Sequence, residues 1–241
     1  LGTPQSADRL VWATPDRPQL GHGAQVSDDG RWLVITTWQG TDDRYEISVL
    51  DLRRRGARPR TLIAGLEHSW ALAGVDGRRL LFTTNKDAPR YRIVSIEPAR
   101  GLASLREVVP QGPGVIQGAQ RIGKRLIVTY LEDAKSAVRS FDLGGGDMRE
   151  VALPGIGSVA GFDGDGDSSE TFFAFSSFNY PTTIFRLDSA SGQVSAFKRP
   201  NVPFDPTRYE VRQEFYRSRD GTRVPMFIVR AKDQPPGPQP T

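Results

Sequence analysis

The stretch that decides the fold begins at Gly30-Arg31-Trp32-Leu33-Val34-Ile35-Thr36-Thr37 and, after a loop, continues as Tyr45-Glu46-Ile47-Ser48-Val49-Leu50-Asp51-Leu52. Both runs are short, rich in β-branched and aromatic residues, and bounded by Gly and Asp, which is the pattern of β-strands. In the second run Tyr45, Ile47 and Val49 alternate with polar residues, as in a strand with one buried face. The stretch therefore predicts a pair of antiparallel strands.

The same pattern recurs along the chain with a constant spacing. The acidic residues that close the second runs are Asp51, Glu97, Asp142 and Asp188. The glycines that open the first three units are Gly30, Gly77 and Gly123. The acidic residues lie 46, 45 and 46 residues apart, and the glycines lie 47 and 46 apart. Because two separate landmarks share one spacing, we interpret the chain as a tandem repeat.

Each repeat contains about four strands, since further short apolar runs such as Arg60–Ile63 and Trp70–Ala73 lie between the pairs. Four short antiparallel strands at a period of about 40–50 residues are typical of a β-propeller blade. A single blade leaves two apolar faces uncovered, so blades stack on one another. The sequence predicts an all-β fold with four consecutive blades. The alternative is a β-sandwich with accidental regularity.

Composition excludes several classes of site. The chain has 241 residues, no cysteine and only two histidines, which excludes disulfide scaffolds, thiolate nucleophiles and multi-histidine metal sites. No apolar run reaches the length of a membrane span. The net charge of +4 comes from 32 basic and 28 acidic residues and is weak evidence for a nucleic-acid partner. We expect neither a nucleic-acid nor a membrane partner, and leave the compartment open between cytoplasm and periplasm.

The repeat ends near Asn201, and a different pattern follows. The segment 202–206 carries two prolines and reads as a linker. Two β-runs then flank the turn Asp220-Gly221, a strong hairpin signal, and residues 234–240 form a proline-rich connector or frayed tail. We therefore predict two parts, residues 1–201 and residues 202–241.

This last hairpin carries a family resemblance. Its motif Asp220-Gly221-Thr222-Arg223-Val224-Pro225-Met226-Phe227 resembles the strand pair that opens the hydrolase domain of prolyl oligopeptidases. Gly23–Arg31 resembles a blade signature of that family, and Arg90–Ile93 and Phe175–Phe185 resemble blade hairpins. The resemblance implies a seven-bladed propeller that caps an α/β-hydrolase domain. It also implies cleavage of short peptides after proline by a Ser–Asp–His triad, without a cofactor.

The chain itself lacks the residues for that chemistry. No serine lies in a Gly-x-Ser-x-Gly motif, which the hydrolase nucleophile requires, and the only histidines are His22 and His68, for which hydrogen-bonded or surface roles are favoured. We expect no catalytic or metal-binding residue here, and expect the rest of a longer chain and short proline-containing peptides as partners. A stand-alone interaction propeller is the alternative, but a C-terminus that leaves the repeat favours the enzyme.

The loop Trp38–Arg44 is the candidate substrate-contacting segment. By resemblance it faces the hydrolase domain, and its positions Trp38 and Thr41 stand where relatives carry an arginine and a cysteine. Trp38 is a candidate to stack on a substrate's proline or aromatic ring. The alternative is that Trp38 packs between loops.

Two further patterns favour structural interpretations. Asp163-Gly164-Asp165-Gly166-Asp167 resembles the start of a calcium loop, but Ser168 and Ala174 stand where an EF-hand needs Gly and Glu, so we predict a polar turn. Arg53–Arg60 contains five arginines in eight residues. An acidic or nucleic-acid partner is one interpretation, and a solvated loop is the favoured one.

Overall fold

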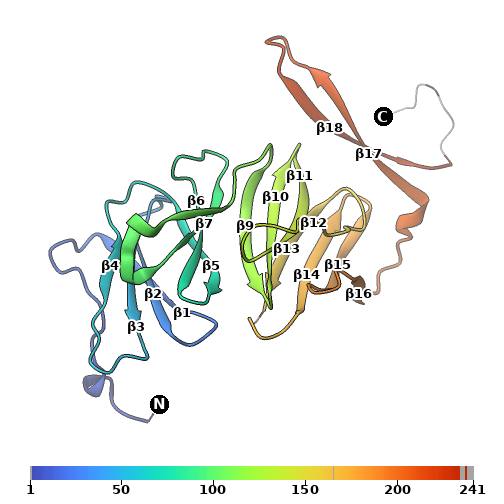
Figure 1. The fold of residues 1–241 in the computed structure, drawn as a ribbon. Coiled ribbons are helices and arrows are strands. Elements are labelled where there is room, and N and C mark those ends of the chain that lie inside the picture. The colour runs from blue at the N-terminus through green and yellow to red at the C-terminus, as the bar shows by residue number, and fades with distance from the viewer. Residues whose placement is uncertain (1, 165, 234–236, 238–241) are drawn as a thin grey trace. The chain divides into compact units, whose positions relative to one another are not determined.

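A computed structural model describes residues 2–164, 166–233 and 237. The chain divides into two compact units, residues 1–111 and residues 112–241, and each contains two four-stranded antiparallel sheets (Figure 1). Helical structure among the described residues is limited to short 3₁₀ turns at η1 (Gln5–Ala7), η2 (Pro98–Ser104) and η3 (Pro206–Arg208). The predicted all-β architecture with four strands per repeat is thus confirmed.

The first sheet is a meander in which each strand pairs with the next. Its strands are β1 (Leu20–Val26), β2 (Trp32–Gln39), β3 (Glu46–Asp51) and β4 (Arg60–Ile63). Strands β2 and β3 are the two runs of the deciding stretch. Strand β1 was not expected, because Gly21, His22 and Gly23 interrupt its apolar pattern.

The second sheet has the same order. Its strands are β5 (Trp70–Asp76), β6 (Arg79–Thr84), β7 (Arg92–Ile96) and β8 (Arg106–Val109). The central strand β6 is buried on both faces from Leu80 onward.

One apolar core joins the first two sheets. Trp32, Val34, Ile47 and Val49 from the first sheet pack in one cluster with side chains of the second, including Phe82. Phe82 is fully buried, and the Trp70 ring meets it edge to face with centroids 6.0 Å apart. The first unit is therefore two sheets joined by a shared hydrophobic layer.

The second unit begins with a third sheet. Its strands are β9 (Val115–Ile122), β10 (Arg125–Glu132), β11 (Lys135–Asp142) and β12 (Arg149–Glu150). Strand β12 contains two residues only. The pairing ends early because the chain runs toward Pro154 and Gly155, which interrupt a strand ladder.

The fourth sheet follows with a core of aromatic rings. Its strands are β13 (Ser158–Asp163), β14 (Glu170–Ser177), β15 (Tyr180–Asp188) and β16 (Val194–Lys198). Phe173 is 1% exposed and stacks on Phe162 and Phe185, with centroids 4.8 and 5.5 Å away. These rings share a cluster with Ile122 and Ile127 of the third sheet.

After the fourth sheet, β17 (Tyr209–Arg217) and β18 (Arg223–Ala231) form a separate two-stranded hairpin. Asp205 caps η3 before it, since its carboxylate accepts hydrogen bonds from the amide and the hydroxyl of Thr207. The sequence signal at Asp220-Gly221 predicted this hairpin. Residues 234–236 and 238–240 of the predicted connector lie outside the described residues.

The repeat extends to a defined pair of positions in each sheet. One member is the first residue of the second strand of the sheet, and the other lies two residues before the closing acid. The pairs are Trp32 with Val49, Arg79 with Ser95, Arg125 with Ser140, and Glu170 with Arg186. The backbone is thus repeated, while the second and third sheets share an arginine–serine pair and the first and fourth sheets carry different ones.

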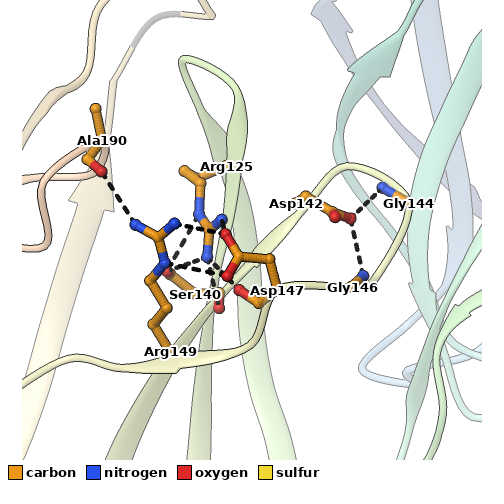
Figure 2. A network of polar contacts seen from close by, with 8 residues as sticks. All are labelled: Arg125, Ser140, Asp142, Gly144, Gly146, Asp147, Arg149 and Ala190. Atoms are coloured by element: carbon orange, nitrogen blue, oxygen red, sulfur yellow. Dashed lines mark hydrogen bonds and ion pairs between the residues drawn. The ribbon is translucent and has the colours of Figure 1, made fainter.

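The third sheet shows how such a pair is completed (Figure 2). Buried Arg125 donates to the hydroxyl and carbonyl of Ser140 and to the Asp147 carboxylate, 2.7 Å away. Arg149 binds the same carboxylate at 2.6 Å and reaches the Ala190 carbonyl. Hydrogen bonds from Arg149 first and Arg125 second lower the pKa of Asp147. One acid on the β11–β12 loop therefore neutralises two arginines.

We predict that Phe173→Ala lowers the free energy of unfolding by about 3–5 kcal/mol, because it removes a buried ring that stacks on two others. Phe197→Ala is the control, since Phe197 is 62% exposed, and should cost about 1 kcal/mol or less. Urea unfolding of the protein that contains this chain measures both values. Equal losses would contradict the assignment of Phe173 to the core.

Candidate functional site

Trp38 and Thr41 line the same hollow at the end of β2. Trp38 is the penultimate residue of the strand and is half-buried, and Thr41 lies exposed in the turn that follows. The hollow has a volume of about 490 Å³ and is also lined by Asp42, Tyr45 and Trp70. We call it the Trp38 hollow. The two residues selected from the sequence are therefore brought together beside further aromatic rings.

Two glycines of β1 hold the Trp38 indole. Gly21 lies opposite Trp38 in the β1–β2 register, and a Cβ at Gly21 would lie 2.8 Å from Trp38 Cε2. A Cβ at Gly23 would lie 3.3 Å from Trp38 Cζ3. The indole therefore lies against backbone that only glycine leaves open. Trp38 thus packs against β1 and also lines the hollow.

The loop beyond Trp38 has a local charge pair. The Arg44 guanidinium binds the Asp42 carboxylate through several contacts, including Nε to Oδ1 at 2.8 Å. This hydrogen bonding lowers the pKa of Asp42. Asp42 lines the hollow, and its ionised carboxylate is neutralised there by Arg44.

A second ion pair ties the N-terminal segment to the start of β3. Arg17 donates two hydrogen bonds to the Glu46 carboxylate, at 2.9 and 2.8 Å, and the Gly65 amide adds a third at 3.2 Å. The Arg17 hydrogen bonds are the main cause that lowers the pKa of Glu46. Glu46 lies two residues after the candidate loop, so this bidentate contact anchors one end of that loop.

The histidines have structural surroundings. His22 Nδ1 lies 2.9 Å from the Thr37 hydroxyl, and Nε2 lies 2.9 Å from the Thr14 hydroxyl. His68 contributes its backbone carbonyl to the amide of Tyr45. Among the residues that the structure describes, neither histidine is hydrogen-bonded to a serine hydroxyl or an acid in the way a catalytic base would be.

A smaller hollow lies beside the C-terminal hairpin. It has a volume of about 240 Å³ and is lined by Lys135, Phe178 and Phe227 among others. The Phe178 and Phe227 rings are 5.5 Å apart, and the Asp133 carbonyl accepts a hydrogen bond from Gln213. These contacts could not be predicted from the sequence, because Asp133 and the hairpin are far apart along the chain.

Of the predicted polar turn, Asp165 lies outside the described residues. The flanking part is held by neutral acceptors: the Thr171 hydroxyl donates to the Asp163 carbonyl, and Arg121 donates to the Gly166 carbonyl. Within the described residues, no three His, Cys, Asp or Glu side chains form a metal-binding group. No helix in that part of the chain could cross a membrane.

Sheets of four antiparallel strands, repeated every 46 residues or so, define the class of β-propeller repeat domains. Residues 1–200 match the family described as the prolyl oligopeptidase N-terminal β-propeller domain. The chain belongs to this family. The resemblance to the prolyl oligopeptidase family is thereby confirmed.

Several relatives carry related names. The chain is 31% identical over 233 residues to a prolyl endopeptidase of Elizabethkingia meningoseptica, with 96% of this chain and 33% of that protein covered. It is 28% identical to prolyl oligopeptidase A of Amanita bisporigera, covering 97% of this chain and 32% of the relative. The chain therefore spans about a third of the curated relatives it matches.

Solved structures of the same family have a similar fold. A chain from a structural study of two prolyl endopeptidases superposes with a TM-score of 0.87 at 40% identity, over 97% of this chain and 35% of its own length. Apo prolyl oligopeptidase B of Galerina marginata gives a TM-score of 0.87 at 23% identity, over 98% of this chain and 34% of its own. The second likeness shows the fold alone.

The Glu46 contact predicts a dependence of stability on pH. Because the pKa of Glu46 is lowered in the folded state from an ordinary value of 4.5, the stabilisation is present above that value and is lost as pH falls through the folded pKa. Since Arg17 is 43% exposed, solvent screening limits it to about 1 kcal/mol or less.

We predict that Glu46→Gln lowers the free energy of unfolding at neutral pH, and that the gap to wild type closes in acid. Glu67→Gln is the matched control, as Glu67 is exposed two residues from Gly65 and should change stability little at any pH. Denaturant unfolding across pH measures the gap. A gap that stays constant in acid would argue against the ion pair.

Proposed function

We propose that this chain is the gating and substrate-filter portion of a proline-specific serine endopeptidase, with the Ser–Asp–His triad outside the chain. The observation that carries the proposal is the family match over residues 1–200. Relatives named prolyl endopeptidase, about three times longer than the matched region, support it. They do not favour the stand-alone interaction propeller.

In this proposal, residues 1–201 are four consecutive blades of a seven-bladed propeller. Four sheets with one strand order support this reading. Residues 202–241 are a linker and the first strand pair of the peptidase domain. The change from four-stranded sheets to a separate two-stranded hairpin at β17 and β18 supports that boundary. The remainder of the same polypeptide is then the chain's principal partner.

The role of the propeller in this mechanism is indirect. A propeller that covers a hydrolase site excludes water and large proteins from the reacting groups. Movement between the two domains would admit a short peptide, and such a movement limits turnover in many enzymes. Acyl transfer by a serine triad requires no cofactor. The described residues supply walls and loops for this role, while the nucleophile, base and acid come from elsewhere.

Trp38 and Thr41 are the proposed substrate contacts. Trp38 offers a flat ring fixed on its inner side by Gly21, and the Trp38 hollow gives a peptide side chain space beside it. The pyrrolidine ring of proline packs well on an indole face. Structures of prolyl oligopeptidase B from Galerina marginata were solved with 25-residue and 35-residue peptide substrates, so peptide binding is known for that relative.

The first experiment is an activity assay on the full-length protein. We predict cleavage of a short chromogenic peptide after proline, much slower cleavage when alanine replaces the proline, and inhibition by a serine-directed fluorophosphonate. The 241-residue chain alone should be inactive on the same peptide. Serine-dependent hydrolysis by the isolated chain, or no preference for proline in the full-length protein, would contradict the proposal.

The second prediction concerns Trp38. In the full-length protein, Trp38→Leu should raise KM for a proline peptide about three- to tenfold through loss of ring stacking, with a smaller change in kcat. Gly21→Ala should raise KM in the same direction, because its Cβ displaces the indole.

Phe197→Leu is the control, since it removes an exposed ring from the outer strand β16 and should leave KM unchanged. If Trp38→Leu lowers only the free energy of unfolding and KM stays at the wild-type value, Trp38 is a packing residue and the proposed substrate contact is wrong.

A further inference from the structure

A second, larger hollow lies at the other end of the first sheet. Its volume is about 770 Å³, and it lies entirely within the first unit. Its charged lining residues are Arg31, Arg54, Arg58, Arg60, Arg78, Asp51 and Glu97. We call it the arginine hollow. Five positive and two negative groups leave an excess of three positive charges around one cavity.

Two of the arginines already have partners. Arg31 binds the Asp51 carboxylate at 3.0 Å, and its guanidinium lies over the Trp32 ring at 4.8 Å. Arg60 donates to the Pro98 carbonyl. These contacts hold the walls of the hollow in place. They also pair Asp51, one of the two acids in the lining, with Arg31.

The other three arginines differ. Within the described residues, the guanidinium groups of Arg54, Arg58 and Arg78 have neither a hydrogen bond nor an ion pair. Arg54 and Arg58 come from the β3–β4 loop, while Arg78 precedes β6 in the next sheet. In the part of the chain that the structure describes, three separate chain positions therefore place arginines without a hydrogen bond or an ion pair around one cavity.

The third sheet provides an internal comparison (Figure 2). There, Arg125 and Arg149 share the Asp147 carboxylate, which the β11–β12 loop supplies. The corresponding β3–β4 loop of the first sheet, residues 52–59, contains arginines and no acid. Arg54 and Arg58 of this loop therefore lack the acid that the third sheet supplies from its corresponding loop. An external anion would supply the missing negative charge.

The hollow is bounded by residues of both sheets. Trp32 of the first sheet, which is 6% exposed, lines the cavity together with Arg78, Glu97 and Pro98 of the second. A solvated loop explains the exposed arginines Arg54 and Arg58, but it does not explain why Arg78 of the second sheet lines the same cavity.

We propose that the arginine hollow binds a compact polyvalent phosphate, with Arg54, Arg58 and Arg78 as its direct ligands. Guanidinium groups match phosphate oxygens in bidentate geometry, and three excess charges suit a multiply charged anion. The volume is in the range of small-ligand sites, about 300–1,000 Å³. The shared chemistry is the oligophosphate group, whether it comes from a nucleoside triphosphate or an inorganic oligophosphate.

The site is separate from the proposed peptide contact. The arginine hollow includes Trp32 and the Trp38 hollow includes Trp38, at opposite ends of the eight-residue strand β2. An eight-residue strand spans roughly 23–27 Å. The anion therefore binds without occupying the peptide site, and this inference does not depend on the proposed function.

The test is calorimetric titration of the full-length native protein with sodium tripolyphosphate at low ionic strength. We expect one site per chain, with binding that weakens as salt is added. The triple variant Arg54/Arg58/Arg78→Ala should weaken binding about tenfold or more, since charge-assisted pairs are lost. The variant Arg55/Arg90/Arg219→Ala removes the same charge from exposed positions outside the hollow and should weaken it less than about twofold.

Further titrations distinguish a phosphate ligand from other anionic partners. Equal weakening in both triple variants, or no saturable binding by wild type, would overturn the proposal. A polyglutamate peptide or a single-stranded oligonucleotide that binds more tightly than tripolyphosphate would also overturn it, in favour of a macromolecular partner. ATP that binds more tightly than tripolyphosphate supports a nucleotide source, and equal binding supports an inorganic one.

A charge-preserving variant guards against misfolding. Arg54/Arg58/Arg78→Lys keeps the net charge but removes the bidentate fork. It should bind with an affinity between wild type and the alanine variant, while its thermal transition stays close to that of wild type. Wild-type affinity in the lysine variant would overturn the assignment of these arginines as bidentate ligands.

Discussion

The central strands β6 and β10 are buried on both faces, and the structure around them depends on covering those faces. In β6 the neighbouring residues Leu80 and Leu81 point to opposite faces, and both are 1% exposed or less. In β10 the same holds for Leu126 and Ile127. Because successive side chains alternate across a strand, such a sheet needs an apolar layer on each side. That requirement explains why the sequence repeats one sheet instead of extending it.

The repeat and its strands could be predicted because they depend on local pattern. Strands are indicated by short runs of Val, Ile and Phe, and the hairpin is indicated by the Asp220-Gly221 turn. Each of these signals lies within a few neighbouring residues, and the closing acids repeat the same local pattern about every 46 residues. Strand β1 was missed because its glycines are selected by the Trp38 ring that lies on them. That reason becomes visible only once β1 and β2 are paired. The family resemblance rested on similar local motifs, and it was confirmed.

The candidate sites were predictable only in part. Trp38 and Thr41 are neighbours in sequence, so finding them in one hollow required little tertiary information. Arg78 joins Arg54 and Arg58 because two sheets share a core, and a reading along the chain gives no sign of that convergence. The arginine-rich loop was visible in the sequence and was interpreted as a solvated loop. That interpretation did not include Arg78, because Arg78 lies outside the loop. The first sheet thus has an aromatic end and a cationic end, joined by one strand.

The changing residue pair at the repeated strand ends has a consequence for folding. Tandem repeats of similar sequence are prone to misassembly, in which a strand from one repeat takes the place of its counterpart in another. Here the second and third sheets share an arginine–serine pair, while the first and fourth sheets differ from them. A β10 strand inserted into the first sheet would set Arg125 against apolar Val49, and one inserted into the fourth would set Arg125 against Arg186. The first and fourth sheets thus discriminate against the central strand of the third, which restricts the orders in which the repeats can assemble.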